Sequence, residues 1–235
     1  MNLFIASEVR SGSTDIAESL AYSFSDSFKM DFWDAGKELF NLINDSTDSS
    51  QIRSILSSLG QNGVGIKCSK IMCGSLSIIC REVKKNPDLY DEFFGEKACW
   101  IIIRRRNKIK QAVSLATAIA SDTWHFYGDP DTSPDNKASI TNESIYDALK
   151  MILLSDDYLE NFSHFVSRST TIYYEDFVGN ELETLKRTIE KLGLPFNQQV
   201  LTISPAKLKR TGQSLKSQAE QEFRQYLLEN YHQVG

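Results

Sequence analysis

The stretch that most constrains the fold lies at the start of the chain, where an apolar run passes through a short polar loop into a helical pattern. Residues 3–7 have the composition of a buried strand, and the helical period begins near Thr14. The loop between them reads Arg10-Ser11-Gly12-Ser13-Thr14. Serine and threonine suit a helix N-terminus, and glycine lets backbone amides approach a ligand closely. A strand, loop and helix in this order direct N–H groups and the positive end of the helix dipole at one point, which is typical of an anion site.

The loop differs from the two best-known phosphate-binding patterns. It has one glycine and no lysine, so it is neither the Walker A motif G-x-x-x-x-G-K-[ST] nor the dinucleotide motif G-x-G-x-x-G. Arg10 supplies the positive charge instead, on a planar group with several donors. Taken alone, the same five residues also fit an ordinary polar turn between a strand and a helix.

A second stretch of the same kind favours the anion site. The Ile-rich run over 98–104 predicts the most buried strand of the chain, and it leads through a basic loop into a helix over about 108–121. Arg106 lies in the loop, and Ser114 lies eight residues further on, two turns into the helix. Both side chains can therefore reach one anion beside the strand end, where ligands bind in open α/β sheets.

Together, R-S-G-S-T at residues 10–14 and the pair Arg106 and Ser114 resemble the two phosphate motifs of sulfotransferases that use 3′-phosphoadenosine-5′-phosphosulfate (PAPS). The run R-R-x-x-x-x-Q-A-V-S-L, followed by Trp124 and His125, is most similar to the bacterial trehalose 2-sulfotransferase-like family, called Stf0. The resemblance continues weakly over nearly the whole chain. It implies a P-loop-like sulfotransferase fold, PAPS as the sulfuryl donor and 3′,5′-adenosine bisphosphate (PAP) as the product.

The resemblance also assigns roles to residues. Residues 10–14 would hold the 5′-phosphosulfate, and Arg10 would also stabilise the charge that develops as the S–O bond breaks. Arg106 and Ser114 would hold the 3′-phosphate. Arg105 is either a further nucleotide ligand or an ion-pairing residue, and Arg210 resembles a C-terminal segment that closes over the nucleotide.

The base that activates the acceptor is less well defined. The Stf0 family carries a glutamate in a G-x-P-x-E-x-F segment after the first helix, and an ungapped alignment from the loop places it on Asp31, with Ser27 and Lys29 in place of the glycine and proline. A surface carboxylate is the alternative interpretation of Asp31. His125 is the other candidate base, although a lone histidine beside an aromatic residue is more often a packing residue. Lys67, at the end of a strand expected over 64–68, could also reach the sulfuryl group, or could be solvated.

Strand and helix patterns alternate along the 235 residues, which predicts an α/β fold with a central, mostly parallel sheet flanked by helices. We expect a single sulfotransferase domain over 1–235. Expected helices cover 14–25, 74–85, 182–192 and 213–231, and residues 144–165 form one long helix or two short ones. A further strand covers 170–174, and residues 28–34 are expected to form a loop. The Asp-, Pro- and Ser-rich segment 128–141 is a candidate lid or a surface loop.

Composition limits the kinds of binding partner and the cellular compartment that we expect for this chain. With a net charge of −5, the chain is a poor candidate for binding nucleic acid or polyanionic glycans. We expect reduced core cysteines, no metal site, no membrane segment and no signal peptide, and therefore a cytoplasmic protein. A homodimer is left open.

The acceptor side is expected to be acidic, because several carboxylates follow the first helix: Asp26, Asp31, Asp34 and Glu38. This pattern predicts a small neutral or cationic acceptor, such as a sugar, a polyol, or a guanidinium- or amine-bearing natural product. Two other functions remain open: a P-loop-like nucleotide kinase and a non-catalytic homologue that binds PAPS.

Overall fold

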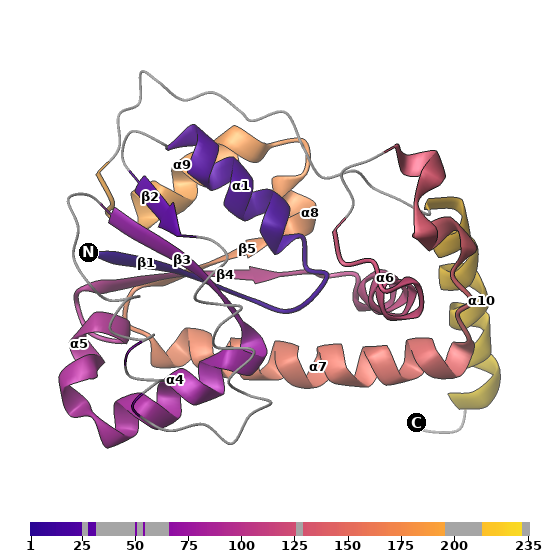
Figure 1. The fold of residues 1–235 in the computed structure, drawn as a ribbon, viewed down its shortest axis with the longest axis horizontal. Helices are drawn as coiled ribbons and strands as arrows, with labels where there is room; N and C mark the ends of the chain where they lie inside the picture. Colours follow the sequence, from indigo (N-terminus) through magenta and orange to yellow (C-terminus); the bar gives the residue numbers. More distant parts are fainter. Residues whose placement is uncertain are drawn as a thin grey trace. The chain divides into compact units, whose positions relative to one another are not determined.

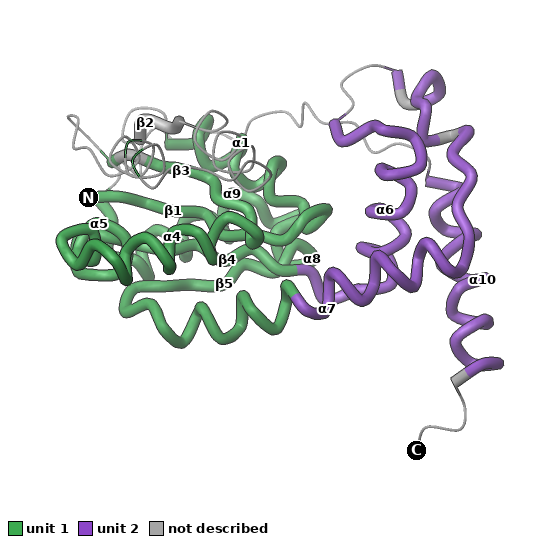
Figure 2. The backbone as a smooth tube through the Cα atoms, turned by 60° about the horizontal axis from the view of Figure 1, so that its bottom comes forward, with its two compact units in different colours: residues 1–104, 155–204 green, residues 105–154, 205–235 purple. Residues whose placement is uncertain are grey.

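The computed structural model describes residues 1–24, 28–31, 50, 54, 66–125, 129–195 and 213–231. The chain divides into two compact units, which Figure 2 colours separately. Unit 1 comprises residues 1–104 and 155–204, and unit 2 comprises residues 105–154 and 205–235.

Unit 1 is built on a five-stranded sheet in the order β2-β3-β1-β4-β5, in which every neighbouring pair is parallel. The strands are β1 (Asn2–Ser7), β2 (Phe28–Asp31), β3 (Ile66–Met72), β4 (Ala98–Arg104) and β5 (Ser169–Tyr173). Ser7 of β1 pairs with Met72 of β3 and with Ile103 of β4, so these three strands end at the same edge. The first six residues of β4 are all buried, as an apolar strand covered on both faces requires.

Helices cover both faces of this sheet (Figure 1). One face packs against α1 (Ser13–Ser23), α8 (Tyr174–Phe177) and α9 (Glu181–Lys191). Its core joins alternate strand residues such as Leu3, Cys68 and Ile101 to Ile16 and Leu20 of α1. Alternation along the strands therefore decides which side chains lie under α1.

The other face packs against α4 (Cys73–Lys85), α5 (Tyr90–Phe93) and the part of α7 (Asn142–Phe165) that follows Leu154, with the short helix η1 (Pro87–Leu89) before α5. Phe4, Phe93 and Trp100 form the centre of this core, and the indole N–H of Trp100 donates to the carbonyl oxygen of Phe93 at 2.7 Å. Phe162 of α7 packs edge-on against the Trp100 ring.

Unit 2 contains α6 (Lys108–Ser121), the short helices η2 (Pro130–Thr132) and η3 (Pro134–Lys137), the first part of α7 and α10 (Gln213–Tyr231). Buried Asp135 of η3 accepts from Ser121 Oγ at 2.8 Å and pairs with Lys216 of α10 at 2.7 Å. The segment 128–141 was expected as a lid or a surface loop. The structure instead ties its η3 turn to two helices.

Most helices and strands of the structure lie close to the positions expected from the sequence. The strand over 98–104 and the helices over 108–121 and 213–231 have the expected bounds. Two expectations were wrong. Residues 28–31 form edge strand β2 rather than a loop, and β3 continues to Met72 instead of ending at residue 68. The expected core position is found for Cys68, Cys73 and Cys99, which are buried, whereas Cys80 is partly buried.

No helix among the described residues is long and apolar enough to cross a membrane.

Candidate functional site

The turn between β1 and α1 has the backbone geometry of a tight ligand-binding loop. Arg10 and Gly12 both have positive φ, at 57° and 85°. A positive φ is costly for a residue with a Cβ, and such strain is concentrated at functional sites. Gly12 is the N-cap residue of α1 and has no side chain to cap the helix, so the first-turn N–H groups face the turn without a capping side chain from that position.

The small side chains of this turn are turned inward. Ser11, Ser13 and Thr14 are all buried, and Ser11 Oγ donates to the carbonyl oxygen of Glu8 at 2.7 Å. Arg10 is partly exposed, so the permanent charge lies at the surface of the turn. The result is a turn of buried small side chains at the carboxyl edge of the sheet, with the partly exposed Arg10 at its rim.

A tyrosine that is distant in the sequence packs against this turn. A Cβ added to Gly12 would lie 2.1 Å from Cδ2 of Tyr174, so the aromatic ring rests directly on the glycine. Tyr174 begins α8, immediately after β5. The sequence pattern placed residue 174 at the end of a strand over 170–174, whereas Tyr174 begins α8 and contacts the turn between β1 and α1.

One functional candidate was missed in the sequence. Lys70 of β3 donates from Nζ to Thr14 Oγ1 at 2.9 Å, and burial lowers its pKa to about 8 although the carboxylate of Glu18 acts in the opposite direction. The predicted strand ended at residue 68, so Lys67 was the lysine expected near its end, but in the structure Lys67 pairs with Asn2 at the start of β1. The signal was the alternation Ile66, Cys68, Lys70, which places the lysine on the face under α1.

The second basic motif begins where β4 ends. Arg104 belongs to unit 1, where it forms a bidentate pair with Asp156 and a further pair with Glu160, so it holds β4 to α7 and has a structural role. Arg105 is partly buried and Arg106 is exposed, and these two residues open unit 2. Ser114 is partly buried on α6.

The C-terminal helix braces the start of α6. Asn107 caps α6 by accepting from the backbone N–H of Lys110 at 2.9 Å, and its amide donates to Glu220 of α10 at 3.0 Å. Burial alone would raise the pKa of Glu220, but hydrogen bonds from Arg224 and Asn107 hold that pKa below its ordinary value. The carboxylate is therefore kept ionised next to the loop that carries Arg106.

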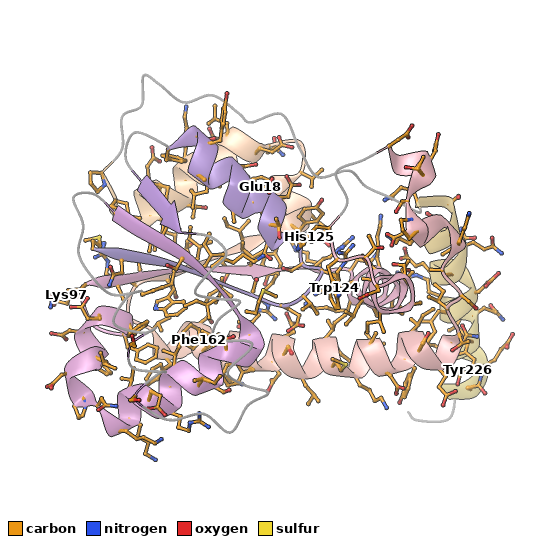
Figure 3. The ribbon with its side chains drawn as sticks, in the orientation of Figure 1. Glu18, Lys97, Trp124, His125, Phe162 and Tyr226 are labelled. Atoms are coloured by element: carbon orange, nitrogen blue, oxygen red, sulfur yellow. The ribbon has the colours of Figure 1, made fainter. Side chains whose placement is uncertain are left out.

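The structure describes only some of the remaining candidate site residues. Asp31 is the last residue of β2 and pairs with Ser69 of β3, so its backbone lies beside the residue that precedes Lys70. His125 follows α6 with Trp124 and is exposed, and Figure 3 labels both residues. Arg210, Asp26, Asp34 and Glu38 lie outside the described residues. No group of three or more metal-ligating side chains occurs in the part of the chain that the structure describes.

A family model described as Stf0 sulphotransferase matches residues 3–225 of this chain. Among solved structures, the chain is similar to mouse sulfotransferase SULT7A1 complexed with PAP, at 15% identity and a TM-score of 0.45, over 94% of this chain and 64% of that one. It is also similar to a sulfotransferase from Alicyclobacillus acidocaldarius, at 13% identity and a TM-score of 0.45, over 98% of this chain and 95% of that one. The chain thus spans slightly less than two thirds of the mouse protein. No curated protein sequence matches it.

Proposed function

The chain belongs to the Stf0 sulphotransferase family, and we propose that it transfers the sulfuryl group of PAPS to a hydroxyl or amine of a small acceptor. PAPS is the donor and PAP is the product. The donor carries a 5′-phosphosulfate and a 3′-phosphate, so its binding needs two anion sites. The two basic motifs of the chain supply the residue types for both.

The observation that carries this proposal is the turn between β1 and α1. Positive φ at Arg10 and Gly12, three buried hydroxyl side chains and the lysine contact to Thr14 are the features of a site for a doubly charged oxyanion. We assign the 5′-phosphosulfate to this turn. Backbone N–H groups there need no reorganisation as negative charge develops on the oxygen that links sulfur to phosphorus.

The second motif is assigned to the 3′-phosphate. Arg106 is exposed and Ser114 is partly buried, so a guanidinium and a hydroxyl are both accessible to a ligand. The 3′-phosphate takes no part in the reaction, and its contacts are therefore equally strong in the ground state and the transition state. Arg105 and Arg210 remain further candidates for nucleotide contacts.

The acceptor loses a proton as it attacks sulfur in line, and a carboxylate base fits the family. Asp31 is our choice because it ends β2 at the edge strand next to β3, which carries Lys70. His125 is the second candidate, since its imidazole is exposed and histidine is the side chain that most often serves as a general base. An acidic acceptor side favours a neutral or cationic acceptor, such as a sugar, a polyol, or a guanidinium- or amine-bearing compound.

The test begins with nucleotide binding. Thermal shift measurements with PAP and with ATP at equal concentrations should show stabilisation by PAP and little by ATP, because ATP lacks the 3′-phosphate. A preference for ATP would support a kinase instead. Transfer from sulfur-labelled PAPS to a panel of acceptors then separates an enzyme from a homologue that only binds the nucleotide.

A further inference from the structure

Lys70 is a partly buried cation at the carboxyl edge of the sheet, and neither phosphate motif includes it. It lies two residues before the end of β3 and pairs with Ile5 of β1, on the sheet face that α1 covers. Its ammonium donates to Thr14 Oγ1 at 2.9 Å, so the charge lies at the first turn of α1. A lysine stem packed under a helix has few alternative positions, and its charge is held where the helix begins.

The turn itself has an arginine but no lysine, whereas phosphate-binding turns of the Walker type place a lysine at the reacting phosphate. Guanidinium and ammonium groups differ in use, because the first is a planar fork and the second is a compact point charge. Lys70 brings the compact charge to the turn from a neighbouring strand. Thr14 links Lys70 to the turn, because Thr14 belongs to the turn and its hydroxyl oxygen accepts the hydrogen bond from the Lys70 ammonium.

We propose that Lys70 is a binding and catalytic residue of the 5′-phosphosulfate site, where its ammonium donates to the oxygens of the phosphosulfate and of the departing 5′-phosphate. The proposal rests on the proposed function. Arg10 at the rim and Lys70 beneath α1 then neutralise the group from two sides. As the S–O bond breaks, the bonding electron pair passes to the phosphate oxygen, and the lysine stabilises that charge without giving up its proton.

The ionisation of Lys70 gives this role a pH signature. Burial lowers the pKa of Lys70 to about 8, so the free protein loses the ammonium charge as pH rises through 8. A bound anion favours the protonated form and raises that pKa. The other charged groups on the elements around Lys70 are Asp15 and Glu18 on α1, Glu8 and Arg10 in the turn, Lys29 and Asp31 on β2, and Lys67 on β3 itself. Of these, Glu18 is the group that opposes the lowering, and it does not cancel it.

The affinity for PAP should therefore fall at high pH. From about pH 7 to pH 8 Lys70 is mostly charged in the free protein and fully charged in the bound protein, and the affinity for PAP changes little. Above pH 8 binding must take up a proton, and the affinity falls by up to roughly tenfold per pH unit. The ligand does not contribute to this change, because the second ionisation of a phosphate monoester lies near pH 6 and is complete by pH 8.

The experiment measures the dissociation constant of PAP by calorimetry from pH 6.5 to 9.5 in the full chain and in three variants. Lys70→Met should bind PAP on the order of tenfold to a hundredfold more weakly at pH 7, with no decline above pH 8. Lys70→Arg should keep most of the affinity and also lose the decline, because a guanidinium stays charged throughout this range.

Lys97→Met is the matched control. Lys97 lies just before β4, at the opposite edge of the sheet, and its exposed ammonium pairs only with Glu92 at 3.2 Å in the described contacts. This variant should bind PAP as the unaltered chain does.

Two further measurements assign the effect to the 5′ group and guard against misfolding. Adenosine 3′-monophosphate lacks that group, so its affinity should be the same with and without Lys70. At pH 8, heats measured in buffers of different ionisation enthalpy should show proton uptake on PAP binding in the unaltered chain and none in Lys70→Arg, which keeps the charge and the fold.

The outcomes separate the two proposals. If the unaltered chain does not bind PAP at any pH, the proposed function fails and the role of Lys70 fails with it. If the unaltered chain binds PAP and Lys70→Met binds it equally well, or if Lys70→Arg shows the same decline above pH 8, only the role of Lys70 is refuted.

Discussion

The contact between Gly12 and Tyr174 makes the turn between β1 and α1 sensitive to the addition of a single methyl group. In Gly12→Ala two costs add. Alanine at a φ of 85° is strained by about 1–2 kcal/mol, as expected for an L-residue in the left-handed region. Its Cβ would also lie 2.1 Å from the Tyr174 ring, where ordinary contacts begin at 3.4 Å.

The ring or the turn must therefore shift by more than an ångström. Overpacking of this kind costs about 1–3 kcal/mol, which brings the total for Gly12→Ala to about 2–5 kcal/mol. Gly179 provides a matched control from the same unit. Its φ is 86°, and nothing lies within 4 Å of an added Cβ. Gly179→Ala should cost only the strain, about 1–2 kcal/mol.

The assay is urea unfolding of both variants, followed by PAP binding. Gly12→Ala should be less stable than Gly179→Ala and should bind PAP at least tenfold more weakly, since the turn to which we assign the 5′ group is displaced. Gly179→Ala should keep the affinity. The double variant Gly12→Ala, Tyr174→Ala removes the ring, and it should be more stable than the sum of the single effects predicts, by about 1–3 kcal/mol. Equal destabilisation by the two alanines, or simple additivity in the double variant, would show that the ring does not rest on the turn.

Three further predictions concern the reaction. Arg106→Ala and Ser114→Ala should raise the dissociation constant of PAP while turnover at saturating PAPS stays near its original value, whereas Arg10→Ala should lower turnover by roughly a hundredfold or more, and steady-state kinetics would separate the two patterns. Asp31→Asn should abolish transfer and leave PAP binding intact if the carboxylate is the base, and loss of transfer in His125→Ala with activity kept in Asp31→Asn would reverse that assignment. Neutral and cationic acceptors should be sulfated in preference to acidic glycans, because like charges about 4 Å apart repel by roughly 4 kcal/mol at an intermediate dielectric. A preference for acidic glycans with sulfur-labelled PAPS would contradict the expected location of the acidic segment.

The sequence by itself determined the local architecture of the protein. A short apolar run rich in isoleucine favours a strand buried on both faces, and this pattern predicted β4 and the helix after it with their bounds. The R-S-G-S-T loop likewise follows from short-range chemistry, since its residue types are those that suit a helix N-terminus. Local patterns also gave the alternation of strands and helices and, through it, the parallel sheet.

Tertiary structure decided which distant residues complete the turn. The contact of Lys70 with Thr14 depends on the pairing of β3 with β1, and the contact of Tyr174 with Gly12 depends on the position of α8 over the same face. No local pattern contains either contact. In the same way, Asp135 lies in a segment that has the composition of a loop, yet it is buried because Lys216 and Ser121 satisfy its carboxylate. Periodicity records which face of an element is buried, whereas the partners on that face are chosen by the packing of the whole chain.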